Sequence, residues 1–228
     1  MERCFLKDTC NGVDCDKPFC MKYFKLNKLY EMSLLTEQQR KHSSLYIDSD
    51  GTDEAAFKAL KTIETNIETF VKEGNNLYIH STICGNGKTS WAVRMLQSYL
   101  NKIWYKCDLE PKVMFINVPR FLLEIKDSIR QESEYISHIK EDAFKCDLLV
   151  WDEIGTKGLT QFEHENVLKY INMRLDSCKS NIYTSNLDSE ELHQAIGDRL
   201  YSRIVNNSID IQLYGSDKRT IKKEKVVL

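Results

Sequence analysis

The sequence predicts a three-layer α/β fold with a mainly parallel sheet, and two stretches carry that prediction. Residues 77–79 have the composition of a short buried strand, and a glycine-rich turn leads from them to a helix expected to begin at Lys88. Farther along, residues 147–151, which contain four consecutive apolar residues, predict a second buried strand that ends in Asp152 and Glu153. Because parallel α/β sheets bind ligands at the carboxyl ends of their strands, both strand ends are expected to face one site.

The turn after the first strand resembles the second half of a phosphate-binding loop. Its glycines let backbone N–H groups turn toward an anion, and the helix that follows adds the positive end of its dipole. Lys88 is expected to reach the β- and γ-phosphates of ATP, and the Thr89 hydroxyl to bind Mg²⁺. The predicted nucleotide-binding residues of this turn are Gly85, Asn86, Gly87, Lys88, Thr89 and Ser90.

One position departs from the full motif G-x-x-x-x-G-K-[ST], which has glycine where this chain has Thr82. A β-branched residue narrows the backbone conformations available there, so the motif alone determines neither the affinity for a nucleotide nor the rate of ATP hydrolysis. The alternative is a strand-to-helix turn in which Gly-Lys-Thr occurs by chance.

The acids at the second strand end supply the other half of a predicted ATPase site. Asp152 is expected to help hold Mg²⁺, and Glu153 to polarise the attacking water. Asn186 ends a further predicted strand, residues 181–186, where it could orient that water. The alternatives are that the two acids are ordinary surface residues and that Asn186 is the N-cap of the helix expected over residues 190–196.

Length and composition limit the remaining classes. The 228 residues suffice for one sizeable core and a small appendage, and a net charge of −2 gives no bulk electrostatic case for nucleic acid. No apolar run approaches the roughly 18 residues of a membrane span, and no signal peptide is recognisable. A cytoplasmic protein with reduced thiols and no membrane partner is therefore expected.

The N-terminus carries a separate signal, because four of the eight cysteines fall within the first twenty residues. Four thiolates could close a structural Zn²⁺ site, although free thiols or an iron–sulfur cluster are alternatives. We expect residues 1–52 to form a cysteine-rich interaction module with its linker, and residues 53–228 the ATPase domain. The cysteines are Cys4, Cys10, Cys15 and Cys20.

Three further segments allow structural predictions, and two of them leave an alternative open. Residues 21–46 mix aromatic and basic residues, as in a partner-binding helix or an amphipathic helix packed on the main domain. Residues 53–71 predict one long helix that stops at Gly74. Residues 126–145 are charged, which suits a solvated helix or a DNA-contacting insert.

Taken together, the chain resembles the AAA+ helicase loaders of the DnaC/DnaI type, especially those encoded by phages. The matching segments follow the order of that family and cover about residues 53–221: Gly85 to Thr89, Asp147 to Gly155, Thr184 to Leu187, Gly197 to Arg203, and Gly215 to Arg219. The resemblance implies a P-loop AAA+ core without a large helical lid. It also implies that Asn186 senses the γ-phosphate, Arg203 is an arginine finger for a neighbouring subunit, and Arg219 is the second sensor.

The resemblance further implies partners. Such loaders grip a DnaB-type replicative helicase with a variable N-terminal segment and bind single-stranded DNA with the ATPase part. Use of Arg203 in a neighbour's site implies a homo-oligomer; the structural alternative is a helical ladder in which Arg199 and Arg203 pair with acids. Rival functions are an IstB-type transposition helper ATPase, an ATP-binding switch that barely hydrolyses, and a small-molecule P-loop kinase.

Overall fold

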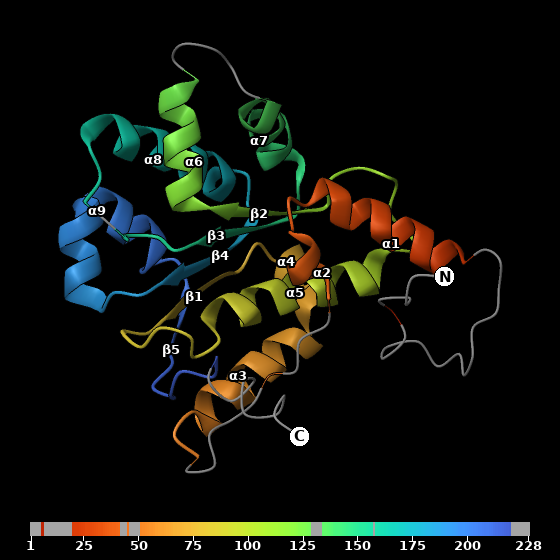
Figure 1. The fold of residues 1–228 in the computed structure, drawn as a ribbon, viewed down its shortest axis with the longest axis horizontal. Coiled ribbons are helices and arrows are strands. Elements are labelled where there is room, and N and C mark those ends of the chain that lie inside the picture. The colour runs from red at the N-terminus through yellow and green to blue at the C-terminus, as the bar shows by residue number, and fades with distance from the viewer. Residues whose placement is uncertain are drawn as a thin grey trace.

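A five-stranded sheet forms the middle of the computed structural model, which describes residues 6, 20–41, 45, 51–128, 134–156 and 158–219 (Figure 1). The strands lie in the order β2-β3-β4-β1-β5, and every neighbouring pair is parallel. Their bounds are β1 Asn76–His80, β2 Val113–Asn117, β3 Leu148–Asp152, β4 Ser180–Ser185 and β5 Ile209–Gln212. The predicted parallel α/β sheet is confirmed, and β4 separates the two strands that carry the site motifs.

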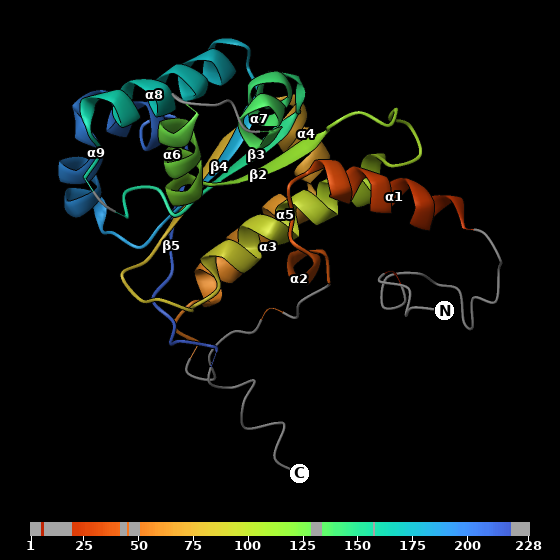
Figure 2. The ribbon, with the colours of Figure 1, turned by 45° about the horizontal axis from the view of Figure 1, so that its top comes forward.

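Helices cover both faces of this sheet and give the predicted three layers (Figures 1 and 2). One face carries α1 Met21–Met32, α2 Glu37–Arg40, α3 Glu54–Thr65, α4 Ile67–Lys72 and α5 Lys88–Ile103. The other carries α6 Val118–Asp127, α7 Glu134–Lys145, α8 Gln161–Asp176 and α9 Ser189–Ile204. Among the described residues, no helix is both long enough and apolar enough to cross a membrane.

The alternation of side chains along each strand builds two hydrophobic cores. In β1, Leu77 and Ile79 pack against α5 and its neighbours, while Tyr78 between them packs on the opposite face. In β3, Val150 belongs to the first core and Trp151 to the second. Successive residues of a strand point to opposite faces, and helices cover both faces of this parallel sheet, so the central residues of both strands are apolar.

The single long helix predicted over residues 53–71 is wrong, because the chain breaks at Asn66. There φ is −105° and ψ is 21°, which ends α3 and restarts the chain as α4. The side-chain amide of Asn66 donates to the Thr62 carbonyl at 2.9 Å, and this local hydrogen bond competes with continuation of the helix. The predicted stop at Gly74 is confirmed: its φ is +69°, and a Cβ there would lie 2.5 Å from the Cys178 carbonyl oxygen.

The described part of residues 21–46 packs on the main domain. Leu26, Leu29 and Tyr30 of α1 join the core beneath α5, and the Phe115 N–H of β2 donates to the Ser33 carbonyl at 2.9 Å. The alternative of a helix packed on the main domain therefore holds for this segment, and residues ahead of the predicted boundary at 52 share the core of the sheet. The boundary itself stays a prediction.

The predicted metal site falls mostly outside the described residues. Cys4, Cys10 and Cys15 lie there, and Cys20 caps α1, its Sγ accepting a hydrogen bond from the Tyr23 N–H at 3.4 Å. Within the described ranges, no three His, Cys, Asp or Glu side chains cluster as metal ligands. Zinc and the cysteine-rich module remain predictions.

The charged segment 126–145 contains α7, which is amphipathic. Its Ile136, Ile139 and Ala143 are buried with α6 and α8 in the second core. This confirms a helix that faces solvent on one side, and DNA contact by this segment stays a prediction.

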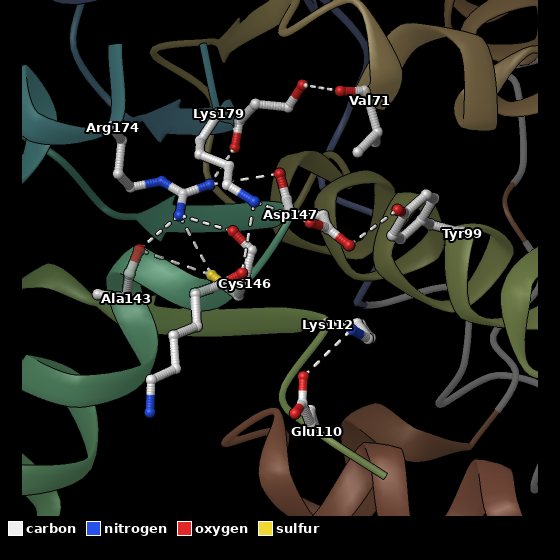
Figure 3. Close-up of polar contacts among 11 residues, drawn as sticks. Val71, Tyr99, Glu110, Lys112, Ala143, Cys146, Asp147, Arg174 and Lys179 are labelled. Carbon is white, nitrogen blue, oxygen red and sulfur yellow. Dashed lines mark hydrogen bonds and ion pairs between the residues drawn. The ribbon is translucent and has the colours of Figure 1, made fainter. Parts of the chain in front are cut away.

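A buried arginine ties together the amino-terminal ends of β3 and β4 (Figure 3). Arg174 of α8 is 1% exposed, and its guanidinium donates to the carbonyl oxygens of Ala143, Cys146 and Ser180 and to Asn181 Oδ1. The side chain thus joins α7, α8 and two strands at the edge of the sheet opposite the predicted site.

Candidate nucleotide-binding site

The loop between β1 and α5 has the backbone shape needed to surround an anion. Gly85 and Gly87 have φ of +77° and +110°, conformations that glycine adopts without steric cost, and Gly87 is the N-cap of α5. These turns, together with the start of a sixteen-residue helix, favour phosphate binding. The predicted strand–loop–helix unit is confirmed.

Lys88 is folded over this loop. Its ammonium is buried and donates to the carbonyl oxygens of Ser81 at 3.2 Å and Ile83 at 2.8 Å, and to Asn86 Oδ1 at 3.2 Å. Burial lowers the pKa of Lys88. The charge is thus held by neutral oxygens alone in these contacts, and a phosphate in the loop would give it an anionic partner.

Two other loop residues, Asn86 and Thr82, affect the shape of the loop. The Asn86 side chain is buried and donates to Ser81 Oγ at 2.7 Å and to the Leu213 carbonyl at 3.4 Å, so it holds the loop against the segment that follows β5. Thr82 is exposed, and its φ lies outside the left-handed region, so the residue that replaces glycine fits without backbone strain.

The carboxylate of Asp152 joins the loop helix to the sheet. Its Oδ1 accepts hydrogen bonds from Thr89 Oγ1 at 2.8 Å and from Thr184 Oγ1 at 2.7 Å. Burial raises the pKa of Asp152, and the two threonine bonds act in the opposite direction. A hydroxyl and a carboxylate this close form part of the oxygen ligand set that Mg²⁺ prefers. The predicted pair therefore fits the metal.

Glu153 is held from two sides in an uncommon backbone conformation. Its φ is +63°, its N–H donates to Thr184 Oγ1 at 3.0 Å, and its Oε2 accepts from Asn117 Nδ2 at 3.0 Å. Non-glycine residues in the left-handed region often mark functional sites. A mainly apolar hollow of about 180 Å³ beside Glu153 is lined in part by Val118 and Leu122.

Sequence reasoning gave no role to Asn117 or Thr184. Asn117 ends β2, and its Oδ1 accepts from the Arg120 N–H at 3.1 Å as the N-cap of α6. An asparagine between a strand and a helix-starting Pro119 signals a cap, but the chain alone does not reveal that β3 lies alongside. Thr184 contacts the two acids only because β4 is the neighbour of β3.

Asn186 follows β4, and the alternative that it caps the next helix is wrong. The N-cap of α9 is Asp188, whose Oδ1 accepts from the Glu191 N–H at 2.8 Å. Asn186 is half-buried at the carboxyl end of the strand that lies between β1 and β3. Its predicted place beside the loop and the acids fits this topology.

The two arginines of α9 are exposed. Neither Arg199 nor Arg203 forms an ion pair with a described acid, so the ladder alternative finds no support there. Both follow a kink at Gly197, where φ is 75° and ψ is 162°. A finger for a neighbouring copy needs this accessibility.

Arg219 lies near the loop, and its role as the second sensor, which the resemblance implies, stays a prediction. The Lys218 N–H donates to the Gly85 carbonyl at 3.1 Å, and the Arg219 N–H donates to Asp217 Oδ1 at 2.9 Å. After burial, which is the larger cause, the positive charge of Arg219 also lowers the pKa of Lys88. The fold thus brings the loop, the two acids and the C-terminal segment to one edge of the sheet.

Comparisons with known proteins agree with this geometry. The sequence model of the family described as "IstB-like ATP binding protein" matches residues 22–225. The replicative helicase loader DnaC of Escherichia coli (strain K12) is 24% identical over 167 residues, which are 72% of this chain and 62% of that protein. This chain therefore spans less than two thirds of that relative's length.

Solved structures show the same fold. A crystal structure of the DnaC helicase loader superposes with a TM-score of 0.61 at 19% identity, covering 74% of this chain and 94% of that one. A crystal structure of DnaI superposes with a TM-score of 0.56 at 16% identity, covering 81% and 93%. At these identities the likeness establishes the fold alone. The resemblance expected from the motifs is confirmed.

Proposed function

This chain belongs to the family of IstB-like ATP binding proteins, and from that premise we propose that it hydrolyses Mg-ATP as a replicative helicase loader. The observation that carries the ATPase proposal is the contact of Thr89 with Asp152 at 2.8 Å, beside a Lys88 whose ammonium is folded over the same loop. That arrangement supports a phosphate site beside a magnesium site.

Each predicted site residue has a role in this proposal. The backbone N–H groups of residues 85–89 and the Lys88 ammonium bind the triphosphate, and Ser90 extends that set along the first turn of α5. Thr89 and Asp152 hold Mg²⁺, which when bound neutralises charge on the phosphates. Glu153 accepts a proton from the attacking water, and Asn186 orients that water.

Two arginines complete the proposed site. Arg219 approaches the phosphates from the C-terminal segment of the same chain, and Arg203 enters from a neighbouring copy. Arginine fingers supplied in this way change turnover by about 10³–10⁵ in other nucleotide hydrolases. Hydrolysis should therefore depend on assembly of a homo-oligomer.

Substitution of Glu153 tests the ATPase proposal. Glu153→Gln keeps the size of the side chain and removes the base, so we expect ATP binding to persist and turnover to be lost, measured as phosphate release at saturating ATP. Lys88→Ala is the matched comparison and should lose binding. Unchanged turnover in Glu153→Gln would contradict the role; wild-type binding with negligible turnover, with or without single-stranded DNA, would favour the switch.

The helicase partner is proposed from the relatives that are named as helicase loaders. The cysteine-rich N-terminus is the proposed grip, and single-stranded DNA the proposed ligand of the ATPase part. Because Leu26, Leu29 and Tyr30 are core residues, deleting residues 1–52 would expose apolar surface. A deletion of residues 1–19 should instead abolish retention of a DnaB-type helicase in a pull-down while ATP binding is kept. Retention by this deletion would contradict the proposed grip.

A transposition helper is the second candidate, because the matching family is described by its IstB-like members. Both candidates use the same ATPase site, so the partner decides between them. Co-purification with a transposase, in place of a replicative helicase, would reverse the choice.

A further inference from the structure

A buried carboxylate at the start of α3 holds a distant part of the chain. Asp53 is 4% exposed; its Oδ1 accepts from the Tyr214 N–H at 2.7 Å and its Oδ2 from the Gly215 N–H at 2.9 Å. Asp53 occupies the N-cap position of α3 but makes no capping hydrogen bond with its side chain. An aspartate there usually caps its own helix, so both oxygens serve the C-terminal segment instead.

The segment held by Asp53 continues directly onto the phosphate loop. The Leu213 N–H donates to the His80 carbonyl at 2.9 Å, next to the start of the loop, and the Lys218 N–H donates to the Gly85 carbonyl at 3.1 Å. Between these contacts, Asp217 packs on Gly85 so closely that a Cβ there would lie 1.9 Å from its Oδ1. The chain is thus anchored on both sides of the loop.

We propose that Asp53 is a positioning residue for the nucleotide site, acting through Arg219. Arg219 lies only four positions after Gly215, a span of about 14 Å at most, so fixing the backbone at Tyr214 and Gly215 limits where the guanidinium lies. Charge-assisted hydrogen bonds to a carboxylate are stronger than neutral ones, which suits a tether. The inference rests on the proposed ATPase function and adds a residue outside every motif.

The test is a double-mutant cycle on ATP affinity, measured by titration with a fluorescent ATP analogue and Mg²⁺. Asp53→Asn removes the charge and places an N–H₂ against a backbone donor, so affinity should fall about tenfold, as for loss of one charge-assisted bond. Arg219→Ala should cause a similar loss, and the double variant should lose no more than Arg219→Ala alone. Glu54→Gln, the neighbouring exposed acid paired with Lys58, should leave affinity unchanged.

Each outcome separates this inference from the proposed function. Unchanged affinity in Asp53→Asn, or losses that multiply in the double variant, would overturn the inference while wild-type binding upholds the site. Absence of binding by the wild type would overturn both. If Asp53→Asn does not fold, Asp53→Ser, whose hydroxyl is a favourable N-cap for α3, takes its place in the same cycle. If neither folds, Asp53 is needed for the fold itself and the inference is overturned.

Discussion

Asp152 carries a carboxylate that suits a magnesium site but destabilises the fold when it is buried and ionised. Its carboxylate is 4% exposed, and burial raises its pKa above the ordinary value of an aspartate. A raised folded-state pKa means that the folded protein binds the proton more readily than the unfolded chain does. The ionised carboxylate therefore costs folding free energy at neutral pH, and this cost disappears as the pH falls below the unfolded value of about 3.9.

Asp152→Asn should consequently raise the unfolding temperature of the nucleotide-free protein at neutral pH. The gain over wild type should shrink as the pH falls toward 4, where the carboxylate in the folded protein is protonated. Thermal unfolding of both proteins across that range measures the difference. A variant less stable than wild type at neutral pH would contradict this account of Asp152.

At the residue scale, the motifs predicted the groups proposed to act on a nucleotide, and they did not predict the residues that hydrogen-bond to those groups. Lys88, Thr89 and Asp152 were predicted from motifs whose residue types follow from phosphate and Mg²⁺ chemistry. The roles of Thr184 and Asn117 were not predicted, because their hydrogen bonds depend on which strands are neighbours in the sheet. Side-chain partners of that kind are set by tertiary structure and have no fixed spacing along the chain.

The kink in α9 is an element whose geometry depends on one residue. Gly197 has φ 75° and ψ 162°, a region open almost only to glycine, and a Cβ there would meet nothing within 4 Å. Substitution would therefore act through backbone conformation alone, at a cost of about 1–3 kcal/mol.

Gly197→Ala should move the half of α9 that carries Arg203. We expect assembly-dependent turnover to fall while affinity for ATP is kept, measured by phosphate release and nucleotide titration. Ser202→Ala, an exposed change beyond the kink, is the control. Full turnover in Gly197→Ala would show that the position of this half-helix does not matter.

Arg174 stabilises the amino-terminal ends of β3 and β4, which lie opposite the candidate site. Its guanidinium satisfies carbonyl oxygens from three segments, and all of these would lose a buried donor on substitution. Arg174→Met should destabilise the protein by about 3 kcal/mol or more in urea unfolding. The folded fraction should bind ATP normally, because the network lies at the far ends of β3 and β4.

Lys169→Met, an exposed change on the same helix, provides the control for Arg174. A loss of stability no larger than that of the control would contradict the proposed anchoring. At this scale the strands and most helices were predictable from periodicity and caps. The break at Asn66 was not, because apolar residues on both sides of it, Leu60 and Ile67, are fully buried and continue a helical pattern.

For the whole molecule, the three-layer architecture followed from two strand-end motifs and continuous apolar strands. The packing of α1 into the first core did not follow, since its low amphipathic contrast also suited a free partner-binding helix. The proposed function adds a claim about more than one molecule: Arg203 is exposed on each chain and serves the site of a neighbour.

A mixing experiment tests that claim most directly. Lys88→Ala lacks a working phosphate site but keeps Arg203, and Arg203→Ala keeps the site but lacks the finger. Mixed together, the two variants should hydrolyse ATP well above the sum of their separate rates, whereas Lys88→Ala/Arg203→Ala should not rescue Arg203→Ala. A mixed rate equal to that sum, with wild-type turnover in Arg203→Ala alone, would contradict the shared site.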